Sequence, residues 1–242
     1  SSINSECRID LIAQAWSVLS GASDAAHTGP AMAAIGKHLH DEPAGLLRLL
    51  APPFAQSTHN PGYIQAYPPG VRENGGQYSH GAVWALMAQA LQGDHEAAWQ
   101  SFEGLSPAHR SQHPARGPVY ELEPYVMAGD VYGAAPYVGR GGWSWYTGSA
   151  AWLHRAAVET LLGLNVKGRQ LSMTPHVPAH WPGFELALRL GTHRLTLQWG
   201  TVEGAAAPTH HVAVGEWIDW QALPADAVLR VAEAAGKGQM TA

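Results

Sequence analysis

The spacing of apolar residues changes near Gly163, and this change limits most strongly what the chain can fold into. Over residues 149–162 apolar residues recur every three or four positions, which is the period of an α-helix. Over 184–190 and 195–199 they recur at every second position, which is the period of a β-strand. Because Gly191 separates the two alternating runs, they predict a β-hairpin.

Two structural parts follow from this change of period. A chain of 242 residues can form one large domain or two ordinary ones. Helical patterns come before the change and strand patterns after it, so we predict the α+β class. The first part, residues 1–164, is expected to be helical. The second, residues 165–242, is expected to be a small antiparallel β-sheet or sandwich domain.

The helical part contains several segments with one apolar face. Pro30 is placed in the first turn of the second segment, where proline is tolerated. The stretch 54–76 is rich in Pro, Gly, Asn and Tyr and is too long for a simple connection, so we expect it to carry function. Further strands are expected around 212–220, and the residues after 222 fit a strand or a short helix. The predicted helices cover 8–20, 29–40 with 46–50 as a continuation, 77–91, 95–104, 123–132 and 149–162.

Composition and charge exclude several classes of function. The net charge is −5 at pH 7 and Lys and Arg do not cluster, so we expect no nucleic-acid partner. Cys7 is the one cysteine, which rules out a disulfide within the chain and fits a reducing compartment. The sequence has no apolar run of about 20 residues and no signal-peptide pattern, so we expect a soluble segment.

The 14 histidines raise the question of a metal site, and their spacing argues against one. There is no His-Glu-x-x-His pattern in the sequence. The adjacent His210 and His211 would point to opposite faces of a strand, so they do not make a ligand pair. We therefore predict no metal.

Residues 139–149, Gly-Arg-Gly-Gly-Trp-Ser-Trp-Tyr-Thr-Gly-Ser, predict an anion site at the start of a helix. Glycines let backbone N–H groups approach a ligand, the hydroxyl of Thr147 adds a donor, and the positive end of the helix favours a phosphate or carboxylate. In an alternative interpretation the glycines form only a turn into the helix, and Trp143 and Trp145 belong to the core.

His80 is a second candidate for binding. It lies three residues before Val83 and seven before Met87, so it shares their apolar face one turn inside a predicted helix. The alternative is a buried histidine whose hydrogen bonds are satisfied within the core.

Three ordered motifs carry a resemblance to a known family. They are Tyr-Pro-Pro-Gly-Val-Arg-Glu-Asn-Gly-Gly-Gln-Tyr-Ser-His at 67–80, Glu-Pro-Tyr-Val at 123–126 and the stretch 139–149. Together they resemble the inverting sugar phosphorylases of glycoside hydrolase family 94, which include cellobiose and chitobiose phosphorylases. The segments at 8–16 and 181–184 also resemble the C-terminal phosphorylase-like region of cyclic β-1,2-glucan synthases.

The resemblance implies a fold and a set of binding residues. The fold is the C-terminal part of an α/α toroid, or six-hairpin barrel, with its active site at the loop-bearing end and a β domain after it. The residues that match phosphate-binding positions are His80, Thr147 and Gly148. The residues that match sugar-binding positions are Tyr67, Arg72, Glu73 and, more weakly, Gln77.

The resemblance also implies inverting phosphorolysis of β-linked gluco-oligosaccharides, with β-1,2-glucan favoured and sugar 1-phosphate as product. Inorganic phosphate is then the co-substrate and no cofactor is needed. A homodimer and a cytoplasmic location, on a parent protein of the inner membrane, are further expectations.

The family's general acid is an aspartate in a Trp-Asn-Asp-Gly type of motif, which does not occur in residues 1–242. We expect this aspartate, and an arginine that completes the phosphate site, in the upstream part of the same parent protein. The fragment would then be inactive alone. Asp130 and Glu123 are the nearest carboxylates, and no motif assigns them the acid's role. The alternatives are a non-catalytic carbohydrate-binding or scaffold module of a glucan synthase, and a hydrolase that uses water.

Overall fold

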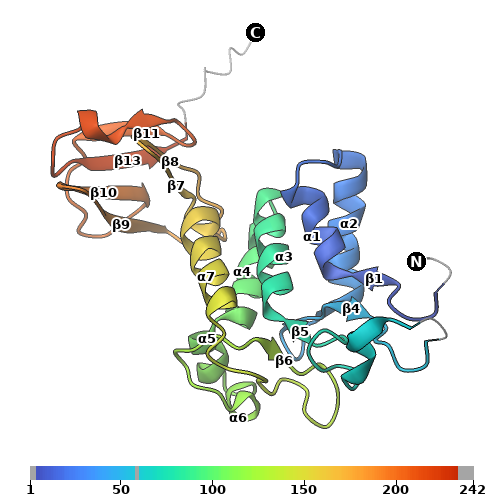
Figure 1. The fold of residues 1–242 in the computed structure, drawn as a ribbon. Coiled ribbons are helices and arrows are strands. Elements are labelled where there is room, and N and C mark those ends of the chain that lie inside the picture. The colour runs from blue at the N-terminus through green and yellow to red at the C-terminus, as the bar shows by residue number, and fades with distance from the viewer. Residues whose placement is uncertain (1–3, 58–59, 234–242) are drawn as a thin grey trace. The chain divides into compact units, whose positions relative to one another are not determined.

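The computed structural model describes residues 4–57 and 60–233. It divides into two compact units, Ser1–Ala157 and Val158–Ala242. Helices dominate the first unit and strands the second, so the α+β class is confirmed (Figure 1). Within the described residues no helix combines the length and apolar character that crossing a bilayer requires.

Helix α3 is the centre of the first unit. It contacts α1, α4 and α7, and α1 in turn contacts α2. Figure 1 shows α3 between α1 and α4. Most of its side chains are small or aliphatic and buried, which allows neighbours to pack on several sides. The toroid of paired helices stays a prediction. The helices are α1 Leu11–Leu19, α2 Ala25–His38, α3 Ser79–Leu91, α4 His95–Leu105, α5 Pro107–Gln112, α6 Gly117–Tyr120 and α7 Thr147–Arg155, and a π-helical segment, η2, covers Ala156–Leu161.

Aspartate caps define where three of these helices begin. Asp10 accepts a hydrogen bond from the backbone N–H of Ala13 at the start of α1. Asp24 and Asp94 make the equivalent bonds at α2 and α4. Each cap satisfies a backbone N–H that has no partner within the helix, and such a cap stabilises a helix by about 1 kcal/mol.

Pairs of two-residue strands connect the loops of the helical unit by backbone hydrogen bonds. β1 Ile9–Asp10 pairs with β4 Leu50–Ala51, β2 His40–Asp41 with β3 Leu46–Leu47, and β5 Gln77–Tyr78 with β6 Asp130–Val131, all antiparallel. A 3₁₀ helix, η1, covers Gly62–Ala66 within the long loop.

Three of the predicted helix assignments differ from the structure. The expected helix over 123–132 is wrong, because Pro124 disfavours a helical start and Asp130–Val131 pairs with β5. The continuation at 46–50 is also wrong, because its residues form β3 and β4. Helix α2 begins at Ala25, so that Pro30 lies inside it and not in its first turn.

The second unit consists of two sheets around an aliphatic core. One sheet has the order β11-β13-β10-β9, and the predicted hairpin is confirmed as β9 and β10. The other has the order β12-β8-β7 and is antiparallel. The strands are β7 Leu164–Lys167, β8 Gln170–Met173, β9 Gly183–Leu190, β10 His193–Gly200, β11 His210–Ala213, β12 Ile218–Asp219 and β13 Val228–Ala232, and Trp220–Ala222 forms the 3₁₀ helix η3. The buried core residues are Leu164, Leu171, Met173, Leu195, Leu197, Val212, Ala227, Leu229 and Val231.

The prediction of a purely antiparallel β domain is wrong. Strand β13 runs parallel to both β10 and β11, so the larger sheet is mixed. The ambiguous tail after 222 contributes this strand, and its last part, 234–242, lies outside the described residues. Strand direction could not be predicted from the sequence, because apolar alternation is the same for parallel and antiparallel strands.

Candidate active site

His80 is the second residue of α3 and lies among aromatic rings. Its imidazole stacks on Tyr78, with ring centroids 5.6 Å apart, and also lies near Trp84 and Tyr146, at 6.0 and 6.2 Å. Nδ1 is buried without a hydrogen-bond partner in the described protein. Partial burial lowers the pKa of His80 below its usual value, because the charged form loses hydration. A neutral imidazole is therefore expected at neutral pH.

The predicted phosphate residues Thr147 and Gly148 begin helix α7. The helix has Tyr146 at its N-cap position and no side-chain hydrogen bond at that cap, and both Thr147 and Gly148 are exposed. A Cβ added at Gly148 would lie 2.9 Å from Nε2 of His80. The structure therefore brings His80 and Gly148 into contact. The imidazole lies against a helix N-terminus that has no side-chain cap, and both groups can donate hydrogen bonds to an anion.

Tyr146 connects α7 to the segment before β6. Its backbone N–H donates to the carbonyl of Met127 at 3.1 Å, and its ring covers Gly129, where an added Cβ would lie 3.1 Å from Cδ2. The ring also lies near His80. This contact was not predicted, because residues 123–132 were expected to be helical. The glycine at 129 is the one signal that pointed to close packing there.

Arg72 lies between two aromatic rings. Its Cζ is 5.2 Å from the ring centroid of Tyr67 and 5.1 Å from that of Trp143. Its Nε is 3.6 Å from a carboxylate oxygen of Glu73. Cation–π contacts on both sides fix the guanidinium in place while it stays partly exposed. The predicted residues Tyr67, Arg72 and Glu73 thus form one cluster, which Trp143 from the glycine-rich loop completes.

Asp130 holds the two site loops together. Its side chain accepts the backbone N–H of Arg72 at 3.1 Å and, more weakly, that of Trp143 at 3.4 Å. It is 2% exposed, and Gly142 lies so close that any side chain there would collide with the carboxylate. Burial raises the pKa of Asp130, and the two N–H groups and the Arg72 charge oppose this effect. Its oxygens already serve the backbone, so we assign it a positioning role.

Gln77 turns its side chain into the protein. Its Oε1 accepts the N–H of Leu47 at 2.8 Å, its Nε2 donates to the carbonyl of Gly104 at 3.5 Å, and the residue is 2% exposed. This amide links β3 to the end of α4. Of the predicted sugar-binding residues, Gln77 is the one whose side chain does not join the cluster around Arg72.

The tryptophans of the glycine-rich loop are not core residues. Trp143 and Trp145 are 64% and 65% exposed. The interpretation in which these rings belong to the core is therefore wrong. The exposed rings lie on the same loop as Thr147 and so flank the start of α7.

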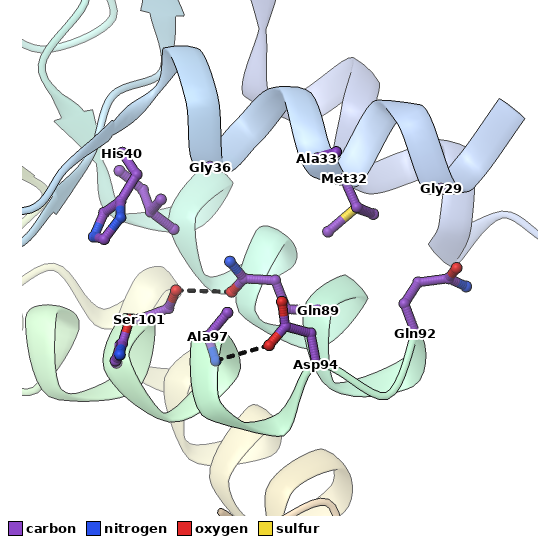
Figure 2. A pocket seen from close by; sticks show the side chains of 12 residues that line it. Gly29, Met32, Ala33, Gly36, His40, Gln89, Gln92, Asp94, Ala97 and Ser101 are labelled. Carbon is purple, nitrogen blue, oxygen red and sulfur yellow. Dashed lines mark hydrogen bonds between the residues drawn. The ribbon is translucent and has the colours of Figure 1, made fainter.

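A separate cavity of 390 Å³ lies between α2 and α4 (Figure 2). Its lining is mostly small and polar. Ser101 donates to Gln89 at 2.7 Å across its floor, and Asp94 is occupied as the cap of α4. No predicted site residue lines this cavity. Over the described part of the chain, no three His, Cys, Asp or Glu side chains lie together in a group suited to a metal ion.

Comparison with known proteins agrees with the clustered motifs. The family model described as "Glycosyl hydrolase 94 superfamily, catalytic domain" matches residues 1–163. The chain is 46% identical over 203 residues to the cyclic beta-(1,2)-glucan synthase NdvB of Rhizobium meliloti (strain 1021), a match that covers 83% of this chain and 7% of the synthase.

Two phosphorylases are also similar. Identity is 30% over 211 residues to the N,N'-diacetylchitobiose phosphorylase of Vibrio proteolyticus, covering 86% of this chain and 24% of that protein. It is 29% over 199 residues to the solabiose phosphorylase of Paenibacillus borealis, covering 80% and 25%. The chain thus spans about a quarter of each phosphorylase and less than a tenth of the synthase. The match over residues 1–163 shows that the chain belongs to the glycosyl hydrolase 94 superfamily.

Proposed function

We propose that two neighbouring groups of residues, together called the loop cluster, serve inverting phosphorolysis of a β-linked gluco-oligosaccharide. His80, Thr147 and Gly148 bind phosphate, and the group around Arg72 binds sugar. The observation that carries this proposal is the contact between Nε2 of His80 and Gly148 at the uncapped start of α7. A neutral imidazole, a threonine hydroxyl and helix N–H groups are all suited to bind a phosphate anion.

The reaction explains why such a phosphate site, the phosphate cradle of His80, Thr147 and Gly148, is needed. An inverting hydrolase needs a carboxylate base to activate water, with the acid on the other side of the sugar. Phosphate is already a nucleophile, so a phosphorylase needs an anion site where the base would be. A phosphate oxygen bonds to the anomeric carbon as the glycosidic C–O bond breaks. The leaving oxygen takes a proton from the general acid, and sugar 1-phosphate is released.

Arg72 and its neighbours form the proposed sugar-contacting side. The guanidinium is held between Tyr67 and Trp143, so its free donors can meet sugar hydroxyls with little further loss of freedom. Glu73 adds a carboxylate whose buried Oε2 lies 3.6 Å from Nε of Arg72, so the two charges form a pair at the edge of the cluster. We place Gln77 behind these residues, as a support for β5.

The general acid is proposed to come from a part of the family's catalytic domain that this chain does not include. Asp130 is unsuited to the role because it is buried and bound to two backbone N–H groups. The chain has no Trp-Asn-Asp-Gly segment. On this proposal residues 1–242 are inactive alone and complete an α/α toroid with upstream residues.

The preference for β-1,2-linked glucose rests on the relative of highest identity among those described above. That protein is a cyclic beta-(1,2)-glucan synthase, whereas the phosphorylases are named for other sugars. No contact in the described cluster distinguishes one linkage from another. The linkage is therefore the part of the proposal that an assay has to decide.

The test uses the protein that carries this chain together with its upstream catalytic region. Release of sugar 1-phosphate from β-1,2-gluco-oligosaccharides is measured with and without orthophosphate. Release that requires phosphate supports phosphorolysis. Release of free sugar without phosphate favours a hydrolase. Binding of oligosaccharide without turnover favours the alternative of a non-catalytic sugar-binding module.

A further inference from the structure

Two exposed aromatic rings lie beside the loop cluster and have no role in it. Tyr125 and Trp145 are 75% and 65% exposed, and their rings meet edge to face with centroids 6.2 Å apart. The indole N–H of Trp145 donates to Glu123 at 3.3 Å. The three side chains therefore form an ordered surface group in which two large apolar rings face water.

The backbone at Trp145 is strained, and its ring is exposed to solvent. Its φ is +60°, a left-handed conformation that is unfavourable for a bulky residue. The next residue, Tyr146, lies with its ring near His80 and its N–H bonded to Met127. The chain thus places one aromatic ring inward on the site and the preceding one outward. Strain and apolar exposure both oppose stability, and both are typical of sites that bind a ligand.

We propose that Tyr125, Trp145 and Glu123 form a distal sugar subsite for a gluco-oligosaccharide whose reacting end lies at His80 and Gly148. This inference rests on the proposed function and deepens it. Trp145 lies two residues before Thr147 and two after Trp143, so the same loop carries the phosphate cradle, the ring that packs on Arg72 and the distal ring.

The chemistry of the group selects a sugar over other partners. A pyranose presents a C–H face that packs on an aromatic ring, and hydroxyls at its edge that donate to a carboxylate. Glu123 supplies that carboxylate beside the rings. Its negative charge disfavours a phosphate or nucleic-acid backbone at the same place. A distal subsite raises the affinity for longer chains, because only they reach from the cradle to Tyr125 and Trp145.

The test compares substrate lengths in the protein that carries this chain with its upstream catalytic region. kcat/KM for phosphorolysis is measured on a β-1,2-linked glucose disaccharide and pentasaccharide in wild type, Trp145→Ala, Tyr125→Ala and Glu123→Gln. We expect each Ala variant to lower the pentasaccharide-to-disaccharide ratio by about tenfold, the scale of one aromatic contact. Glu123→Gln is expected to lower it less.

Tyr137→Ala is the matched control. Tyr137 is an exposed aromatic residue that contacts Arg140 and lies outside the proposed group. Its replacement is expected to leave the ratio unchanged. An unchanged ratio in both Trp145→Ala and Tyr125→Ala would overturn the proposal, and so would an equal loss on both substrates, which indicates a structural role.

Failure of the proposed function gives a different result. In that case wild type yields no phosphate-dependent product from either substrate. Calorimetric binding of the same two oligosaccharides then tests the subsite. A preference for the pentasaccharide that Trp145→Ala removes supports it, and equal binding of the two lengths in wild type overturns it.

Discussion

The helical unit and the β unit bury different kinds of groups. The β unit packs leucine and valine side chains from both sheets into an aliphatic core. The helical unit also has an aliphatic core, but in the first two turns of α3 three polar atoms are buried without hydrogen-bond partners in the described structure. These atoms are Oγ of Ser79, Nδ1 of His80 and Nε1 of Trp84.

Under the proposed function, the polar atoms of α3 serve ligand binding, whereas the aliphatic core of the β unit stabilises the fold. A buried polar atom without a partner reduces stability, so a protein keeps it only where something is gained. Of these residues, His80 lies against Gly148 at the start of α7, and Trp84 lies against Trp152 further along that helix. The β unit has no comparable group among its described residues, where Nδ1 of His193 is the one such atom. We therefore place function in the helical unit.

His80→Ala gives the largest expected effect on function. It removes the imidazole that meets the start of α7, so phosphate-dependent turnover is expected to fall by about a hundredfold or more, as on loss of one preorganised donor. Rates are measured in the protein with its upstream catalytic region, and circular dichroism checks the fold. His193→Ala in the β unit is the control and is expected to keep the rate. Equal losses in both variants would remove the distinction between the units.

Leu197→Ala gives the largest expected effect on stability. Leu197 is 1% exposed in the core of the β unit, and its truncation is expected to lower the free energy of unfolding by about 2–5 kcal/mol. Urea denaturation measures this change. The turnover of the molecules that remain folded is expected to be unchanged. A loss of turnover in fully folded protein would show that the β unit takes part in the reaction.

Asp130→Ala tests the link between the two site loops. The backbone N–H groups of Arg72 and Trp143 lose their acceptor, which costs about 1–3 kcal/mol for each group that stays buried. KM for the sugar is expected to rise because Arg72 and Trp143 are no longer held together. Asp130→Asn keeps one acceptor oxygen and is expected to restore part of the function. If Asn behaves like Ala in both stability and KM, the positioning role is contradicted.

Gly148→Ala gives the smallest expected effect among the variants. The added Cβ would lie 2.9 Å from Nε2 of His80, so the ring must shift or be covered. We expect KM for phosphate to rise by about tenfold with little loss of stability, because alanine is favourable in a helix. Gly29→Ala in α2 is the matched control, since an added Cβ there meets no atom within 4 Å. An unchanged KM in Gly148→Ala would argue against the cradle.

The sequence predicted the parts of the fold that depend on local periodicity. Helices α1, α3 and α4 and the β9–β10 hairpin follow from apolar spacing in the sequence, although α3 is buried on several sides and not on one face alone. Strand β13 and the pair β5–β6 depend on pairing between distant residues, and two-residue strands carry no period. The true start of α2 depends on the cap at Asp24, whereas the predicted start at 29 rested on Pro30.

The candidate site also combines features that the sequence predicted with features that it did not. Motifs indicated His80, Gly148 and Arg72, and the structure places His80 against Gly148 and Arg72 between two rings. The role of Asp130 as a tie between loops was not visible, because it depends on two backbone N–H groups 58 and 13 residues away along the chain. The inward direction of Gln77 was missed for the same reason, because its partners lie in other elements.

The titration of His80 tests the phosphate cradle most directly. Its imidazole resonances are followed by NMR against pH, with and without inorganic phosphate, and His80→Ala identifies them. Without phosphate the account predicts a pKa below about 6.5, because burial disfavours the charged ring. With phosphate the pKa is predicted to rise, because a bound anion favours the imidazolium form. A pKa that phosphate does not change, or that chloride at the same ionic strength changes equally, would contradict the account.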